Sequence, residues 1–439
     1  MTNPLSLAGL LSPMMSSSGM REALSDRARL QRMLDFELAL ARAQAALGLI
    51  PALAIDAIAN AARAEHYDVN ALGEETQICG NAAAPVLQAL AAQVTKTDAT
   101  AAACVNLGAS PRDLIDTALV LDLRAAIDVL LGDLNRAVDG FAALAGRHRR
   151  TGTVGRVGLR HALPMPLGLK LAGYATALAR SRDRLRRLRR EALVLQFGGE
   201  AGTLASLNER GLDVAERLAA LLDLPLPEAP WHSHRDRLAE IACGFAILTG
   251  TCGKIARDLS LLMQTEVKET LAPSVSAALA AATMVPNLVA AILTAQVQEH
   301  ERGLDEWSAD TLILPAIALA SSGALAAVAS AGEKLEIDSE RMRANIGATY
   351  GAVMAEPVAA ALSAKIGRQE ANRIVEEVSS EAVASRRDLQ ELLAQDERVR
   401  PHLTVGELAK LFEPMAYQGA AQTFIDRMVG ALQGRLGRR

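Results

Sequence analysis

The chain has 439 residues and a formal net charge of −4, and half of its residues are hydrophobic although only 3% are aromatic. A nucleic-acid-binding protein would need a basic excess, and the four cysteines, which form no CxxC pair, argue against a zinc site or a disulfide scaffold. Alanine and leucine dominate, and both favour helix, whereas sheets are rich in β-branched and aromatic residues. We therefore expect an all-α protein that binds no nucleic acid.

Leucine and alanine recur every three or four residues along most of the chain, which predicts a series of long helices. The first should cover 25–48, with Ser25 as its N-cap and Gly48 after its end. Ser110 and Pro111 predict another helix start, since serine caps well and proline suits the first helical position. No alternation typical of strands is visible. The further helices are expected at 82–95, 110–150, 165–192, 235–270, 275–300 and 311–335.

The segment 333–346 is more charged and poorer in alanine than the helices before it, and we place a domain boundary there. A chain of this length can form two or three domains. The simplest arrangement is a bundle of long helices with a smaller helical domain at each end. We expect an N-terminal domain at 1–103, a central long-helix bundle at 104–335 and a C-terminal domain at 336–439.

Two uncharged runs, 271–298 and 311–332, are long enough to cross a membrane. Pro286 and Asn287 interrupt the first run, and the segment between the runs is charged without a positive bias. Helices buried in a large oligomer have the same hydropathy, so we expect no membrane association. The first twenty residues contain no Lys or Arg, which argues against a secretory signal, and reduced cysteines suit a cytoplasmic location.

Five blocks carry a family resemblance: CVNLGASPRDLIDTALVLDLR (104–124), GRVGLRHALPMPLGLKLAG (155–173), LVLQFGGEAGTLASL (193–207), PWHSHRDRLAE (230–240) and GKIARDLSLLMQTEV (253–267). In this order they resemble the fumarase/aspartase superfamily, and within it the 3-carboxy-cis,cis-muconate cycloisomerases. The resemblance implies a fumarase/aspartase-like fold, a homotetramer with active sites shared between subunits, and a small di- or tricarboxylate substrate. It implies neither a metal nor an organic cofactor.

One segment departs from the family pattern. Members usually carry a loop of the form GSSTMPHKRNP between the helix that ends in QTEV and the long apolar helix after it. In this chain QTEV (264–267) is soon followed by Pro273, which runs directly into Ser274. The serine of that loop, which the family uses as a base, is therefore missing, as are the lysine and asparagine that bind the carboxylate and the carbanion.

The resemblance also assigns two candidate catalytic residues, His161 and Ser110. His161 matches the histidine of the family's QHA motif and is expected to act as acid or base. Ser110 either donates to a substrate carboxylate or only caps its helix. Asn106 stands where the family has histidine, and its amide cannot titrate but can still bind substrate. Asp113 and Asp116 are expected to be first-turn helix anions rather than catalysts.

Three arginines are expected to bind substrate carboxylates, because the guanidinium fork matches the two carboxylate oxygens. Arg156 is shared with the family, although it could instead form a surface ion pair. Arg160 replaces a family glutamine and adds a cation, and Arg302 lies in the family-like segment QEHERGL. His232 and His234 lie two residues apart, which does not favour a metal pair on a helix. The glycines of FGGEAG (197–202) lack the spacing of a phosphate loop and predict a turn.

Three hypotheses for function remain open. The first is a cycloisomerase that adds a carboxylate of 3-carboxymuconate across a double bond to give a lactone. The second is a superfamily lyase that acts by β-elimination on another substituted succinate, since the second block has lost hydroxyl groups and gained Arg160. The third is an inactive helical scaffold or binding protein, because several site positions depart from the family together.

Overall fold

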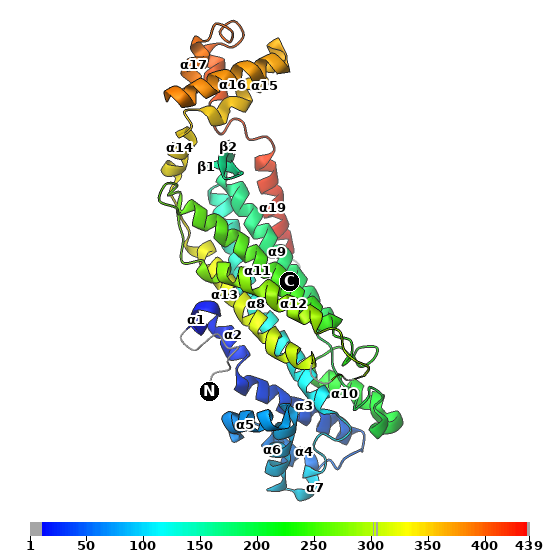
Figure 1. Cartoon of the computed structure of the whole chain (residues 1–439). Coiled ribbons are helices and arrows are strands. Elements are labelled where there is room, and N and C mark those ends of the chain that lie inside the picture. Colours follow the sequence, from blue (N-terminus) through cyan, green and yellow to red (C-terminus); the bar gives the residue numbers. More distant parts are fainter. Residues whose placement is uncertain (1–10, 302, 304–305, 437–439) are drawn as a thin grey trace. The chain divides into compact units, whose positions relative to one another are not determined.

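The computed structural model describes residues 11–301, 303 and 306–436. This part of the chain is mostly helical, and its strands form two antiparallel ladders of two strands each (Figure 1). The expected all-α class is therefore confirmed. The chain divides into two compact units. Unit 1 contains the described residues up to 134 together with 181–253 and 276–327, and unit 2 contains 135–180, 254–275 and the described residues from 328 onward.

Four long helices contribute residues to both units, because four of the five unit boundaries fall within them. These helices are α8 (Pro111–Arg147), α9 (Leu167–Glu191), α11 (Asp236–Leu262) and α13 (Glu306–Lys334). The helix predicted at 235–270 was too long, since α11 ends at Leu262. Pro315 lies inside α13, which continues through it. The three-domain division remains a prediction.

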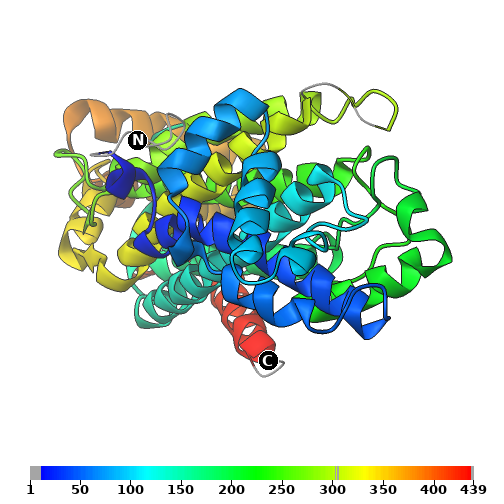
Figure 2. The same ribbon diagram turned by 90° about the horizontal axis from the view of Figure 1, so that it is seen from below.

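The other helices of unit 1 are mostly short. Those between residues 26 and 102 pack together, as the blue helices of Figure 2 show from below. The helices in question are α1 (Ser12–Met15), α2 (Ser18–Ala23), α3 (Asp26–Ala46), α4 (Ala54–Ala61), η1 (Ala64–His66), α5 (Val69–Cys79), α6 (Ala83–Thr95), α7 (Ala99–Ala102), η2 (Ala205–Arg210), α10 (Gly211–Leu222) and α12 (Ser276–Thr294).

Helix α3 begins as its sequence predicts. Ser25 Oγ accepts a hydrogen bond from the backbone N–H of Ala28 at 3.3 Å, which satisfies one of the unpaired donors of the first turn. Leu30 and Leu34 on the apolar face are buried. Gly48, just beyond the helix, has φ +72°, a conformation that favours glycine. The predicted N-cap is confirmed.

Buried ion pairs connect three long helices inside unit 1. Arg235 donates to both oxygens of Asp116 on α8 at 2.7 and 3.0 Å, and its Nε donates to Asp310 at the start of α13 at 2.7 Å. Arg112 Nε donates to Asp116 at 2.7 Å. All four side chains are almost inaccessible to water, where removing one partner of a paired charge strongly destabilises a fold. Asp116 therefore holds helices together, which is more than the first-turn role expected for it.

Small residues let the helices approach closely. A Cβ placed on Gly253 of α11 would lie 2.5 Å from the Cβ of Ala282 on α12, in unit 1. In unit 2, a Cβ on Gly140 of α8 would lie 2.8 Å from the carbonyl carbon of Gly332 on α13. Neither position has room for a methyl group. Glycine and alanine at these two contacts thus allow the close approach of the helices.

Unit 2 contains both ladders, although the sequence shows no alternation typical of strands. β1 (Gly152–Val157) and β2 (Arg160–Pro166) form a hairpin, and β3 (Thr270–Leu271) pairs with β4 (Glu336–Ile337). Gly158 and Leu159 at the hairpin turn have φ +56° and +64°, the pattern of a type I′ turn. Glycines and prolines within β1 and β2 hide the alternation that would have predicted them.

The remaining helices of unit 2 follow β4 in the sequence. Among them, α15, α16 and α17 pack around a common apolar core that includes Val358, Ile374 and Leu389 (Figure 1). The helices are α14 (Ser339–Gly347), η3 (Ala352–Met354), α15 (Ala355–Ile366), α16 (Arg368–Ser385), α17 (Leu389–Gln395), α18 (Val405–Leu411) and α19 (Ala421–Leu436).

Within the described part of the chain, three helices are long and apolar enough to cross a membrane by length and composition: Asp236–Leu262, Ser276–Thr294 and Ala309–Lys334. In the first and third, 61% and 67% of the most apolar window is buried within the chain. In α12 only 33% is buried. The apolar character of the first and third helices is thus largely explained by burial in the fold, and that of α12 is not.

Candidate active site

The first candidate block lies at the start of α8, in unit 1. Ser110 is buried, and its Oγ accepts a hydrogen bond from the backbone N–H of Asp113 at 3.3 Å. In return, the Asp113 carboxylate accepts from the backbone N–H of Ser110 at 2.9 Å. This reciprocal pair is a capping box with aspartate in the third position. The capping role of Ser110 is therefore present in the structure.

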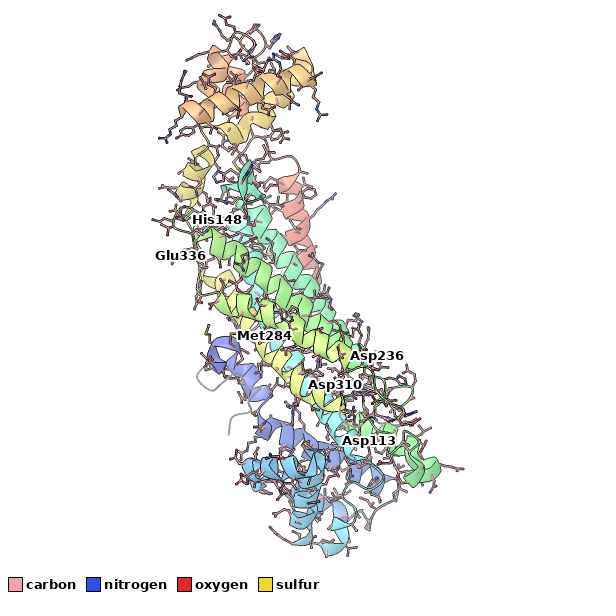
Figure 3. All side chains as sticks on the ribbon, in the orientation of Figure 1. Asp113, His148, Asp236, Met284, Asp310 and Glu336 are labelled. Carbon is pink, nitrogen blue, oxygen red and sulfur yellow. The ribbon has the colours of Figure 1, made fainter. Side chains whose placement is uncertain are left out.

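Asp113, labelled in Figure 3, also fixes the turn predicted at FGGEAG. Its carboxylate accepts hydrogen bonds from the backbone N–H groups of Gly198 and Gly199 at 2.9 and 2.8 Å, and from Gln196 Nε2 at 3.0 Å. Burial raises the pKa of Asp113, and these donors oppose that rise. Gly199 has φ +70°. The glycines thus bind a carboxylate of the chain itself, which is a structural use of a turn and not a phosphate site.

Asn106 adopts a left-handed backbone conformation, with φ +56°. Its backbone N–H donates to Glu37 Oε2 on α3 at 2.8 Å, and its Nδ2 donates to the carbonyl of Ala109 at 3.4 Å. Its Oδ1 is buried and has no hydrogen-bond partner among the described residues. Burial raises the pKa of Glu37 to about 8, so this carboxyl is largely protonated at neutral pH. Asn106 is therefore held by an acid that sequence reasoning missed.

The second candidate block is the β1–β2 hairpin in unit 2, where Arg156 is the cross-strand partner of His161. Arg156 donates to both oxygens of Glu269, at 2.6 and 3.1 Å. Glu269 is fully buried and also accepts from Asn345 Nδ2 at 2.8 Å and from Thr153 Oγ1 at 3.3 Å. Arg156 thus forms an ion pair, as one alternative expected, but the pair is with a buried carboxylate and not on the surface.

His161 is partly buried, and its Nδ1 has no hydrogen-bond partner among the described residues. Burial lowers the pKa of His161, and the charge of Arg156 lowers it further, while Glu269 opposes both effects. Burial and Arg156 thus favour the neutral form of the imidazole. A neutral imidazole can accept a proton, which suits the predicted role of acid or base.

Arg160, by contrast, is exposed and donates no hydrogen bond to any residue that the structure describes. Its neighbours at the hairpin tip, Val157 and Leu159, are 72% and 83% exposed. Arg302 lies outside the described residues. The candidates thus fall into two sets, with Asn106 and Ser110 in unit 1 and the hairpin residues in unit 2.

The segment that should carry the family loop is short. Leu271 ends β3, and α12 begins at Ser276, so only residues 272–275 connect them. The backbone N–H of Ala272 lies 3.3 Å from Met263 Sδ, which keeps the connection close to the end of α11. This connection contains one serine, Ser274, and neither a lysine nor an asparagine.

Sequence reasoning missed Glu37, Glu269 and Asn345. Each is a polar side chain whose role depends on contacts with residues 69 to 116 positions away, so no local pattern could identify it. No group of three or more His, Cys, Asp or Glu side chains that could hold a metal ion occurs in the described part of the chain.

Comparisons with known proteins agree with this architecture. A family model described as "Lyase" matches residues 15–277, and one described as "Adenylosuccinate lyase C-terminus" matches residues 351–428. A 3-carboxy-cis,cis-muconate cycloisomerase of Bradyrhizobium diazoefficiens is 53% identical over 97% of this chain and 99% of its own length. The crystal structure of the 3-carboxy-cis,cis-muconate lactonizing enzyme from Pseudomonas putida matches with a TM-score of 0.94 and 42% identity, covering 97% of this chain and 99% of that one. The chain therefore belongs to the fumarase/aspartase superfamily.

The predicted fumarase/aspartase-like fold and the prediction of an enzyme are thus confirmed. The alignment with the Bradyrhizobium protein runs over 445 positions, more than the 439 residues of this chain, although 97% of the chain takes part. That relative therefore has residues for which this chain has none.

Proposed function

We propose that the chain is a 3-carboxy-cis,cis-muconate cycloisomerase. In this reaction a carboxylate of the substrate adds across a double bond within the same molecule, and a proton is delivered to the neighbouring carbon. The observation that carries the proposal is the hairpin geometry. A partly buried His161, whose neutral form is favoured, lies opposite an arginine whose position is fixed by a buried carboxylate.

The chemistry needs a proton donor and fixed positive charge. The neutral imidazole of His161 removes the proton from carbon in the delactonising direction, and after taking up a proton from solvent the same side chain delivers it to carbon during lactonisation. Negative charge develops on the carboxylate conjugated with the double bond, and cationic groups nearby stabilise it. Arg156, Arg160 and Arg302 are proposed to bind the carboxylates. Asn106 and the hydroxyl of Ser110, which belong to unit 1, are proposed to contribute to sites that are shared between subunits.

We also propose that the chain is a cytoplasmic homotetramer. Helix α12 is strongly apolar, yet only 33% of its most apolar window is buried in the single chain. A helix with an uncovered apolar face is stable in water when another subunit covers it. The test is the mass of the purified protein in solution by light scattering, where a monomer would contradict the proposal.

The test of the activity is turnover of 3-carboxy-cis,cis-muconate, followed by loss of its ultraviolet absorbance, on a sample whose intact mass matches this sequence. We expect lactone formation, and a 10²- to 10⁴-fold loss of kcat in His161→Ala, the range typical of a general acid or base. His66→Ala removes an exposed histidine and serves as the matched control. A folded oligomer without turnover would contradict the proposal and favour the lyase or scaffold alternatives.

A further inference from the structure

Lys170 is a lysine in the first turn of α9, immediately after the hairpin strand β2. Its side chain is partly buried, and it donates no hydrogen bond to any residue that the structure describes. A partly buried ammonium group with three unused N–H donors is unfavourable unless something else binds it. The surroundings of Lys170 indicate what that could be.

Two packed helices place Lys170 between two carboxylates. Tyr174 follows Lys170 by one turn on the same face of α9, and its hydroxyl donates to Asp258 Oδ2 on α11 at 2.5 Å. One turn further along α11 lies Leu262, whose carbonyl accepts the backbone N–H of Glu269 at 2.9 Å. Helices α9 and α11 run in opposite directions (Figure 1), so the direction from Tyr174 back to Lys170 is also the direction from Asp258 toward Glu269. Both carboxylates act electrostatically on Lys170.

Both carboxylates accept hydrogen bonds from other side chains, and neither accepts one from Lys170. Asp258 accepts from Tyr174 and from Lys254, and Glu269 accepts from Arg156, Thr153 and Asn345. Burial lowers the pKa of Lys170, and the nearby charges of Lys254 and Arg156 lower it further. The cluster thus has three cations, Lys170, Lys254 and Arg156, against two carboxylates. The cluster therefore carries one positive charge in excess, which one more anion would neutralise.

We propose that Lys170 is a substrate-binding residue that donates a charge-assisted hydrogen bond to one carboxylate of the polycarboxylate substrate. The inference rests on the proposed function and makes it more specific. Arg156, which acts electrostatically on Lys170, is the cross-strand partner of His161, so the bound carboxylate lies on the same side of the unit as the candidate base. Lys170 binds the substrate carboxylate, while His161 transfers the proton.

The first experiment replaces Lys170 by methionine, which keeps the length of the side chain and removes its charge. We expect KM for 3-carboxy-cis,cis-muconate to rise by roughly 10- to 100-fold, as for loss of a hydrogen bond to a charged group, with kcat changed much less. Lys170→Arg should retain a KM within a few-fold of the parent. Lys410→Met, an exposed lysine on α18, is the matched control. Melting curves confirm that the variants fold.

The second experiment needs no turnover. The whole protein is labelled with acetic anhydride at neutral pH, and the acetylated lysines are identified by mass spectrometry, with and without propane-1,2,3-tricarboxylate. We expect the tricarboxylate to protect Lys170 and to leave Lys410 labelled. If the parent turns over muconate but Lys170→Met has an unchanged KM and Lys170 is not protected, this inference is wrong while the proposed function stands. If turnover is absent but protection is seen, the carboxylate site stands and the reaction is wrong.

Discussion

Glu269 and Arg156 form a two-point ion pair, at 2.6 and 3.1 Å, between the β1–β2 hairpin and the turn that follows α11. The same carboxylate accepts from Thr153 on β1 and from Asn345 on α14. One buried residue outside the hairpin therefore sets the position of the strand that faces His161. The candidate base depends on a contact that is remote from it in the sequence.

Replacing Glu269 by glutamine should destabilise the protein and change the titration of His161. The guanidinium of Arg156, only 18% exposed, would lose its anion, which typically destabilises a fold by about 3 kcal/mol. Since the charge of Glu269 raises the pKa of His161, its removal should lower that pKa, measurable by NMR titration. Glu333→Gln breaks the exposed pair with Arg136 and should change the stability by less than about 1 kcal/mol. An unchanged pKa of His161 would contradict the linkage.

Glu37→Gln should stabilise the protein at high pH. The pKa of Glu37 is raised from 4.5 to about 8 in the folded chain. The stabilising contribution of its protonated form is thus complete below about pH 4.5 and is lost as the pH rises through 8. An amide keeps an acceptor for Asn106 and never ionises.

We expect Glu37→Gln to match the parent in denaturant unfolding at pH 5 and to exceed it at pH 8, by on the order of 4 kcal/mol. Glu381→Gln, at an exposed position, should follow the parent at both pH values. If the free energies of unfolding of the parent and of Glu37→Gln change equally between pH 5 and pH 8, Glu37 is not protonated in the folded state.

Two substitutions of Ser110 should separate its capping role from a chemical one. Ser110→Ala removes the cap and should destabilise by about 1 kcal/mol, whereas Ser110→Gly should lose only a few tenths. Both variants lack the hydroxyl group. An equal fall in kcat/KM in the two variants would therefore indicate that the hydroxyl of Ser110 acts on the substrate. If instead kcat/KM falls in Ser110→Ala, the less stable variant, and hardly in Ser110→Gly, Ser110 serves only as a helix cap.

Gly140→Ala should destabilise the protein by about 1 to 3 kcal/mol, because its Cβ would meet the backbone of Gly332 at 2.8 Å. Gly146 lies on the same helix with no atom within 4 Å of an added Cβ. Gly146→Ala should therefore be neutral or stabilising by up to about 1 kcal/mol, from helix propensity alone. Thermal unfolding of both variants tests the explanation given for the close approach of the helices.

Inserting GSSTMPHKRNP between Pro273 and Ser274 should raise kcat if the connection is short because a catalytic loop has been lost. We expect a gain of roughly 10²-fold or more, the contribution of a general acid–base group. The matched control is the same insertion with both serines replaced by alanine. Equal rates in the two insertions would show that this chain uses another base.

The helices were largely predictable because their patterns are local. Ser25 and Ser110 marked real helix starts, and the leucine spacing marked the buried face of α3. The hairpin was missed because Gly155 and Pro164 disguise its alternation. Among the site residues, the motif led to His161, but nothing local predicted that Glu269 would hold Arg156 or that Glu37 would hold Asn106. Contacts between residues far apart in the sequence produce no local pattern from which they could be predicted.

The two-residue ladder between β3 and β4 has a practical consequence. The backbone at Thr270 and Leu271 is fixed by its pairing with Ile337 and Glu336, and helix α12 begins independently at Ser276. The chain between these anchors can shorten without disturbing either of them. Expression level, solubility and melting temperature would therefore not reveal the loss of a reactive segment at this junction. If variants of such an enzyme were selected only for correct folding, those that have lost the catalytic segment at this junction would be retained.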